Sequence, residues 1–140
     1  MAEPTEELLD LIFLALDHAV KSVISSSGPL IPFAIVEAAS GEQTLARFTT
    51  GRNPEEARRH ARAHVAQAAD CVKYAVAGDG TLTENGQRIV VVTIEAGKRG
   101  EKHGFLFVQR FASSAKCRFE RPVRNPGIID LPAILGPAAG

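Results

Sequence analysis

The sequence predicts an α+β fold, a two-layer domain in which two helices pack on an antiparallel sheet of five to six strands. The expected order is α-β-β-α-β-β-β, with one more strand as an optional last element. Two observations carry this prediction. Residues 88–111 contain two β-rich runs around a charged turn, and residues 6–24 and 54–70 show helical spacing of apolar side chains. Short links between the strands favour antiparallel pairing, with both helices on one face of the sheet.

The first helix is predicted at residues 6–24. Thr5 is placed to cap its N-terminus, Glu6 and Glu7 lie where the helix dipole favours acids, and the Gly-Pro pair at 28–29 ends it. Its apolar stripe is wider than packing on one sheet requires. We therefore expect this helix to lie between its own sheet and a second subunit. The residues that widen the stripe are Leu9, Phe13, Leu14 and Ile24.

A β-hairpin is predicted next, with strands at residues 31–37 and 44–49. The link between them, residues 39–42, has the sequence Ala-Ser-Gly-Glu and is typical of a turn. Pro32 has no N–H to donate to a β-ladder. The first strand is therefore expected to begin at or beside Pro32 and to lie at an edge of the sheet.

The second helix has the clearest start signal in the chain. Asn53 is suited to the N-cap, Pro54 to the first helical position and Glu56 to the return bond of a capping box. One face carries mostly small side chains, which allow the helix backbone to approach a sheet closely. The helix is expected to end near Asp70. The small-residue face comprises Ala57, Ala61, Val65, Ala68 and Ala69.

Three more strands follow this helix, and a fourth is optional. Residues 71–77 are predicted as a strand, and the turn signals at 78–80 and 85–86 leave residues 81–83 as either strand or loop. Within residues 88–111, Gly97 and Gly100 bracket a tight turn. Residues 115–120 are the optional last strand.

The end of the chain differs from the rest, so the domain is assigned to residues 1–121 and a tail to residues 122–140. The tail has no helical period, contains four prolines and is still rich in isoleucine and leucine. Free tails are normally polar. We therefore expect this proline-rich apolar segment to dock on its own or on a neighbouring subunit. The prolines are Pro122, Pro126, Pro132 and Pro137.

Length and composition favour one domain in a reducing compartment. The chain has 140 residues, and its two cysteines, Cys71 and Cys117, are too few for a disulfide framework. No secretory leader is recognisable, and the apolar runs are far shorter than the ~20 residues of a membrane-spanning helix. We expect a cytoplasmic protein with reduced thiols and without a membrane partner.

The charges are unevenly distributed although the net charge is zero. Residues 1–46 contain seven acids and one base, and residues 98–124 contain eight bases and two acids. A basic segment can bind a polyanion, or it can face acids of the same chain or of a second subunit. The chain has one Tyr, no Trp and no recognisable nucleic-acid module, so binding to nucleic acid is the weaker interpretation.

No motif predicts catalysis, a cofactor or a metal. His60 and His64 are four residues apart on the second helix, but Ala61 stands where a zinc-protease motif requires Glu, and no third ligand is evident. Glu95 and Lys98 resemble the acid and lysine of metal-dependent nucleases only thinly, because their spacing differs from E-x-K. We therefore expect the protein to bind no cofactor.

The leading hypothesis is a non-catalytic domain that works by association. The expected partner is a second copy of the chain, in a homodimer, and another protein is a further possible partner. One alternative is a small-molecule-binding protein or enzyme with a polar pocket between helix and sheet. The second alternative is nucleic-acid binding through residues 98–124. The candidate pocket or interaction residues are Arg47, Tyr74, Glu95, Arg110, Arg118, Arg121 and Arg124.

Overall fold

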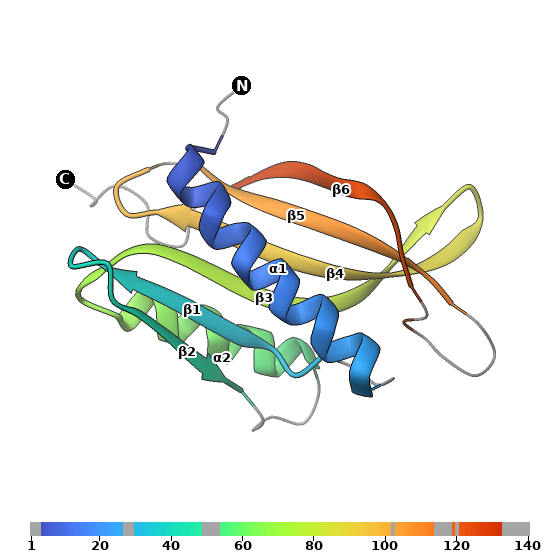
Figure 1. Cartoon of the computed structure of the whole chain (residues 1–140), viewed down its shortest axis with the longest axis horizontal. Helices are drawn as coiled ribbons and strands as arrows, with labels where there is room; N and C mark the ends of the chain where they lie inside the picture. The colour runs from blue at the N-terminus through green and yellow to red at the C-terminus, as the bar shows by residue number, and fades with distance from the viewer. Residues whose placement is uncertain are drawn as a thin grey trace.

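The computed structural model describes residues 4–26, 30–48, 54–101, 103–113, 119 and 121–132. All six strands belong to one antiparallel sheet in the order β2-β1-β3-β4-β5-β6 (Figure 1). The α+β class, the antiparallel sheet and the order of elements are confirmed, with a last strand at residues 121–132 rather than at the predicted 115–120. The elements are α1 (Glu6–Ser26), β1 (Phe33–Ala38), β2 (Gln43–Arg47), α2 (Pro54–Gln67), β3 (Cys71–Glu84), β4 (Gln87–Lys98), β5 (His103–Ala112) and β6 (Arg121–Pro132).

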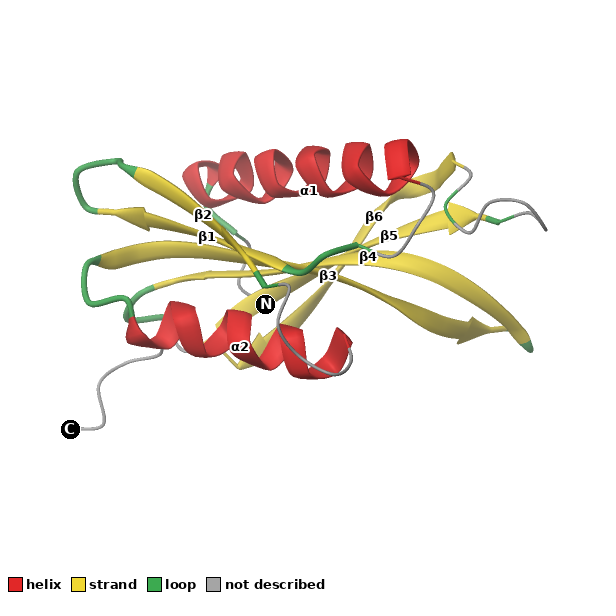
Figure 2. Cartoon of the chain, turned by 90° about the horizontal axis from the view of Figure 1, so that it is seen from below, coloured by secondary structure: helices red, strands yellow, loops and turns green. Residues whose placement is uncertain are grey.

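The two helices lie on opposite faces of the sheet, which corrects the predicted two-layer arrangement (Figure 2). α1 packs on β3 and β4, whereas α2 packs on β1 and β3. Strand β3 contacts both helices because successive side chains of a strand point to opposite faces of the sheet. Ala75 and Ala77 join the core under α1, and Tyr74 and Val76 join the core under α2. The domain therefore has three layers, with a separate core on each side of the sheet.

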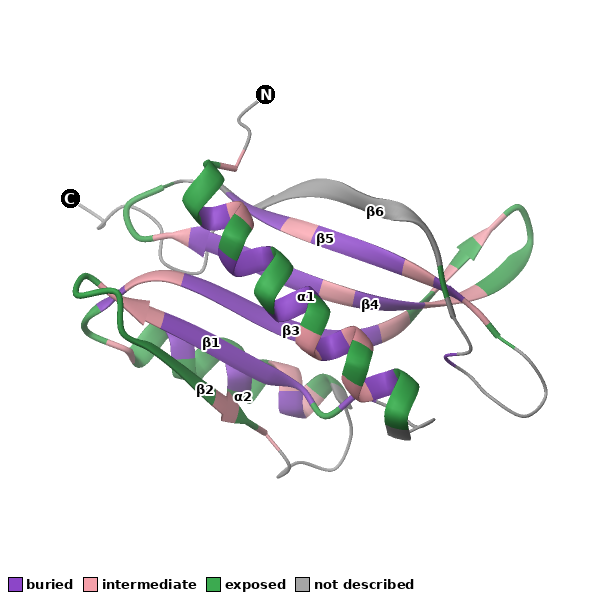
Figure 3. Ribbon diagram, viewed as in Figure 1, coloured by how far each residue is buried: buried purple, intermediate pink, exposed green. Residues whose placement is uncertain are grey.

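The core under α1 is the larger one. Thr5 caps the helix as predicted, since its Oγ1 accepts a hydrogen bond of 3.3 Å from the Leu8 amide. The helix buries one face against the sheet, and its outer face is largely exposed (Figure 3). Phe13 and Leu14 belong to the wide part of the stripe and remain half exposed, at 50% and 48%.

The core under α2 is small and tight. Pro54 begins the helix as predicted, while its predicted cap, Asn53, lies outside the described residues. Ala57, Ala61 and Val65 are buried, in agreement with a close approach of α2 to the sheet.

Strand β3 is longer than predicted. It continues through Gly78 and Gly80 to Glu84, and the chain then reverses at Asn85 (φ 51°) and Gly86 (φ 77°), which form the predicted turn. Gly78 is not a turn residue. A Cβ at Gly78 would lie 2.9 Å from two guanidinium nitrogens of Arg58, so the glycine leaves space for that side chain to cross the strand.

The strand pairing corrects one prediction about an edge of the sheet and places part of the predicted tail in a strand. β1 lies between β2 and β3 rather than at an edge; Pro32 precedes the strand, and its carbonyl accepts the Phe48 amide at 2.9 Å. Residues 122–132 of the predicted tail belong to strand β6, which pairs with β5. Residues 115–118 and 133–140 lie outside the described residues. Among the described residues, neither helix combines the length and apolarity that crossing a membrane requires.

Arg99, in the turn after β4, forms hydrogen bonds with the segment that links α2 to β3. Its Nε and Nη2 donate to the carbonyls of Cys71 (2.6 Å) and Ala68 (2.9 Å), and its amide donates to Val72 O at 2.8 Å. A cation at the C-terminal end of a helix also interacts favourably with the helix dipole.

We expect Arg99→Met to lower the free energy of unfolding by about 1.5 kcal/mol, because charged hydrogen bonds to these carbonyls are lost. Lys98→Met is the matched control on the neighbouring residue and should change stability by less than about 0.5 kcal/mol. Urea denaturation of both variants checks this. Equal losses in the two variants would show that the Arg99 contacts do not stabilise the fold.

Candidate interaction surface

The structure does not bring the predicted pocket residues together. Arg47 ends β2 on the α1 side of the sheet, whereas Tyr74 is buried in the core under α2. Glu95 is buried and accepts a hydrogen bond from Arg62 Nε at 2.7 Å. Arg110 pairs with Glu84, at 2.6 Å and 3.0 Å. Arg47 therefore lies on the other face of the sheet from Tyr74, and Glu95 and Arg110 are each paired with a residue of opposite charge.

The remaining candidates fall in the basic segment 98–124. Arg118 lies outside the described residues, and the structure places Arg121 and Arg124 in β6 without describing their side chains. Two bases of the segment are described with partners, and both bind groups of their own chain: Arg99 binds backbone carbonyls and Arg110 binds Glu84. These two side chains add no support to a polyanion site.

The exposed edge of β2 was missed by the sequence reasoning. The Phe48 amide donates to Pro32 O, and Glu42 O accepts the Ala38 amide, so both residues direct their backbone groups toward β1. Backbone groups of successive strand residues point to opposite edges. Gln43, Leu45 and Arg47 therefore direct their N–H and C=O groups to the free edge of the sheet.

Apolar side chains lie beside this edge. Leu45, in the middle of β2, is 37% exposed and pairs with Ile35 of β1 on the side of the sheet that faces α1. Leu14 of α1 is adjacent, and the three side chains line a hollow of about 200 Å³ together with His18, Gln43 and Thr44. We name the free edge of β2 with Leu14 and Leu45 the β2-edge surface.

His18 and Arg47 form a polar bridge between α1 and the end of β2. The Arg47 Nη2 and His18 Nε2 atoms are 3.0 Å apart, which fits a neutral imidazole accepting from the guanidinium. The His18 ring also meets Phe33 edge to face, with centroids 5.0 Å apart. A second hollow, of about 240 Å³, opens beside this bridge. Its other lining residues are Ser22, Ser25, Leu30 and Ile31.

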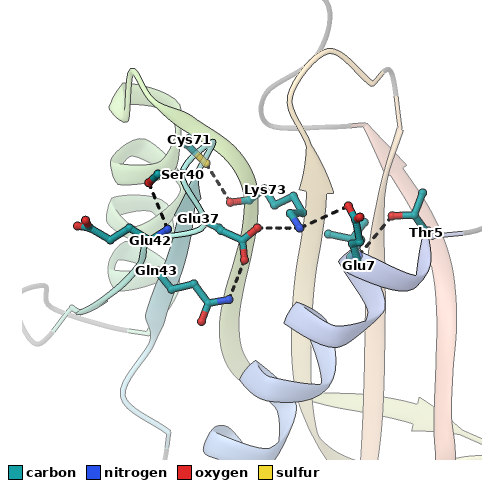
Figure 4. Close-up of polar contacts among 9 residues, drawn as sticks. Thr5, Glu7, Glu37, Ser40, Glu42, Gln43, Cys71 and Lys73 are labelled. Carbon is teal, nitrogen blue, oxygen red and sulfur yellow. Dashed lines mark hydrogen bonds and ion pairs between the residues drawn. The ribbon is translucent and has the colours of Figure 1, made fainter.

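A charged network connects the other end of β2 with α1 (Figure 4). Lys73 Nζ lies 2.7 Å from Glu37 Oε2 and 3.8 Å from Glu7 Oε2, and Gln43 Nε2 donates to Glu37 Oε1 at 2.7 Å. Burial acts to raise the pKa of the Glu37 carboxyl. The hydrogen bonds from Lys73 and Gln43 and the charge of Lys73 outweigh burial and hold this pKa below the ordinary value of 4.5.

The low pKa of Glu37 makes the fold sensitive to acid. A carboxyl whose pKa is lower in the folded state stabilises the fold above its unfolded pKa and loses this contribution as the pH falls through its folded pKa. Glu37→Gln should therefore be less stable than wild type at pH 7, and the difference should shrink below pH 4.5. Melting temperatures between pH 7 and pH 3 test this. Glu42→Gln, an exposed carboxyl of the same hairpin, is the control; a pH-independent difference for Glu37→Gln would contradict the assignment.

A third hollow, of about 220 Å³, lies on the α2 side and is lined by His64, Asp70 and Cys71, among others. These residue types can serve nucleophilic catalysis, but burial raises the pKa of the Cys71 thiol, which donates to Lys73 O at 3.1 Å. The His64 ring contacts Phe48, with centroids 5.5 Å apart. In the described part of the chain, no group of three or more His, Cys, Asp or Glu side chains is arranged to hold a metal ion.

We compared the chain with known protein families, curated proteins and solved structures. No protein-family profile matches the sequence, and no curated protein and no solved structure is significantly similar to the chain.

Proposed function

We propose that the protein is a non-catalytic domain that works by association with a second copy of itself. The observation that carries the proposal is the β2-edge surface, where backbone groups without a partner among the described residues lie beside exposed apolar side chains. A strand edge of this kind is a template for pairing with another chain. A cytoplasmic location is part of the proposal, and the free, buried thiol of Cys71 fits a reducing compartment.

The exposed apolar side chains support association more broadly. Within the described residues, large exposed apolar side chains occur on α1 and around the β1–β2 hairpin. Two of these side chains, Leu14 and Leu45, line the same hollow beside β2, and exposed apolar side chains that lie together in this way are typical of protein interfaces. A stable dimer buries about 800 Å² on each partner, so the proposed interface extends from the edge of β2 onto the flank of α1. These side chains are Phe13, Leu14, Ile24, Ile31 and Leu45.

The oligomeric state of the whole chain tests the proposal. Sedimentation equilibrium at micromolar concentration should give a dimer for wild type, and Leu45→Lys should raise the dimer dissociation constant at least about tenfold, because a charge replaces an apolar contact. Gln87→Lys introduces the same charge at the exposed tip of the β3–β4 hairpin and should leave the dimer intact. A wild-type monomer under these conditions would overturn the proposal.

A second candidate function is the binding of a small acid with a short apolar body beside His18 and Arg47. Within the described residues Arg47 has no carboxylate partner, whereas Arg62 and Arg110 each have one. The hollow beside Arg47 combines its guanidinium with the apolar side chains of Leu30, Ile31 and Phe33. A cation that has no carboxylate partner and lies beside apolar side chains favours a carboxylate ligand.

Thermal unfolding in the presence of butyrate, hexanoate and octanoate tests this candidate. The melting temperature should rise with the acids and not with the corresponding alcohols, and Arg47→Gln should abolish the rise. Arg88→Gln, an exposed arginine of β4, is the control. An equal response to acids and alcohols would exclude a site built on the Arg47 charge.

A further inference from the structure

We infer that the second copy docks through β2, so that the two β2 strands pair antiparallel about a twofold axis at Leu45. This inference rests on the proposed self-association and specifies its geometry. In this arrangement Gln43 of one protomer lies opposite Arg47 of its partner, and Thr44 lies opposite Ala46. The two six-stranded sheets become one continuous sheet.

The backbone directions fix the register. The groups that point to the free edge belong to Gln43, Leu45 and Arg47, because Glu42 and Phe48 direct theirs to β1. Two residues that exchange both hydrogen bonds of an antiparallel pair must both face the shared edge. Pairing Leu45 with its own copy also pairs Gln43 with Arg47. A register shifted by two residues leaves one of the three outward residues without a partner in the strand.

The side chains agree with the same register. Gln43, Leu45 and Arg47 pair with Glu37, Ile35 and Phe33 and therefore share the face that α1 covers. At the seam, the two Leu45 side chains are cross-strand neighbours, and each has Leu14 of its own α1 nearby. The guanidinium of Arg47 faces the neutral amide of Gln43 rather than a second Arg47. A twofold axis at Arg47 would instead place like charges opposite each other, which is destabilising.

The other edge of the sheet explains why the pairing closes as a dimer. β6 contains Pro122, Pro126 and Pro132, which lack the N–H groups that a further strand would need. Prolines of this kind are typical of edges that do not pair with another chain. β2 contains no proline. Because one edge pairs with itself and the opposite edge is blocked, the assembly is isologous and finite.

A charge exchange across the seam tests the register. Gln43→Lys places a second cation opposite Arg47 twice in each dimer, and we expect the dimer dissociation constant to rise roughly tenfold. The new lysine still offers Glu37 a hydrogen-bond donor in place of the amide, so the fold should be kept. The double variant Gln43→Lys with Arg47→Glu restores opposite charges and should return the dissociation constant to within about threefold of wild type.

The outcomes separate the register from the proposed function. Circular dichroism and melting temperature establish that each variant is folded, and sedimentation equilibrium gives the dissociation constants. A dimer that Gln43→Lys does not weaken, or that the double variant does not restore, would overturn this register and leave self-association standing. A wild-type monomer would overturn both.

Discussion

Replacing Gly97 with alanine should lower the free energy of unfolding by about 3 kcal/mol, at the upper end of the range for overpacked cores. Gly97 pairs with Tyr74 across β3 and β4, and the tyrosine ring lies over the glycine. A Cβ at Gly97 would lie 2.5 Å from the Tyr74 Oη atom and 2.8 Å from its Cζ. Tyr74 is fully buried in the core under α2, so a shift of its ring disturbs the core side chains packed around it.

Gly80→Ala is the matched control for this substitution. Gly80 also lies in the sheet, but the nearest atom to its added Cβ is Val91 Cγ2 at 4.0 Å, an ordinary contact. The variant should be as stable as wild type or slightly more stable, because alanine loses less conformational entropy than glycine on folding. Urea midpoints that are equal for Gly97→Ala and Gly80→Ala would contradict the packing of Tyr74 on Gly97.

Ala61→Leu should lower the free energy of unfolding by about 2 to 3 kcal/mol, because the side chain of Ala61 has no free space between α2 and the sheet. Its neighbours in the core include Val65, Tyr74 and Val76. Ala63→Leu makes the same change on the exposed face of the same helix and should have little effect. Chemical denaturation compares the two variants directly. A larger loss of unfolding free energy for Ala63→Leu than for Ala61→Leu would contradict the assignment of the Ala61 face of α2 to the sheet.

Local signals predicted most of the elements. The side chain of Thr5 and the turn at Asn85 and Gly86 involve residues close in sequence, so their chemistry can be recognised without the fold. The start of α2 at Pro54 is another local signal. Gly97 shows the limit of such signals. It suits a tight turn, but the chain stays in β4 through Lys98, and the glycine is needed because Tyr74 crosses it from another strand.

The placement of the two helices on opposite faces of the sheet depends on contacts between residues that are distant in sequence. Residues 75–77 (Ala75, Val76 and Ala77) are apolar at every position, which is the sequence pattern of a strand covered on both faces. All three residues are buried in the structure. Which helix covers which face is not encoded locally. The pairing of Arg62 with Glu95 spans 33 residues and links α2 to β4, so it was not accessible before the fold was known.

The candidate surface was predicted only in part. The wide apolar stripe of α1 indicated contact with a second subunit, and Leu14 is exposed beside β2. The free edge itself depends on strand order, because β2 becomes an edge only when β1 pairs with β3. The one sequence signal that distinguishes the two edges is proline. It is absent from β2 and present in β6, which the sequence reasoning treated as a tail.

Cysteine cross-linking at the twofold axis tests the central claim, self-association through β2, most directly. In a Cys117→Ser background, in which Cys71 is buried, Leu45→Cys places two thiols on facing residues whose Cα atoms are about 5.5 Å apart, within disulfide range. Mild oxidation at micromolar concentration should convert this variant to a covalent dimer, whereas Gln87→Cys should remain largely monomeric on a denaturing gel. Cross-linking of Leu45→Cys no faster than that of Gln87→Cys would contradict pairing through β2.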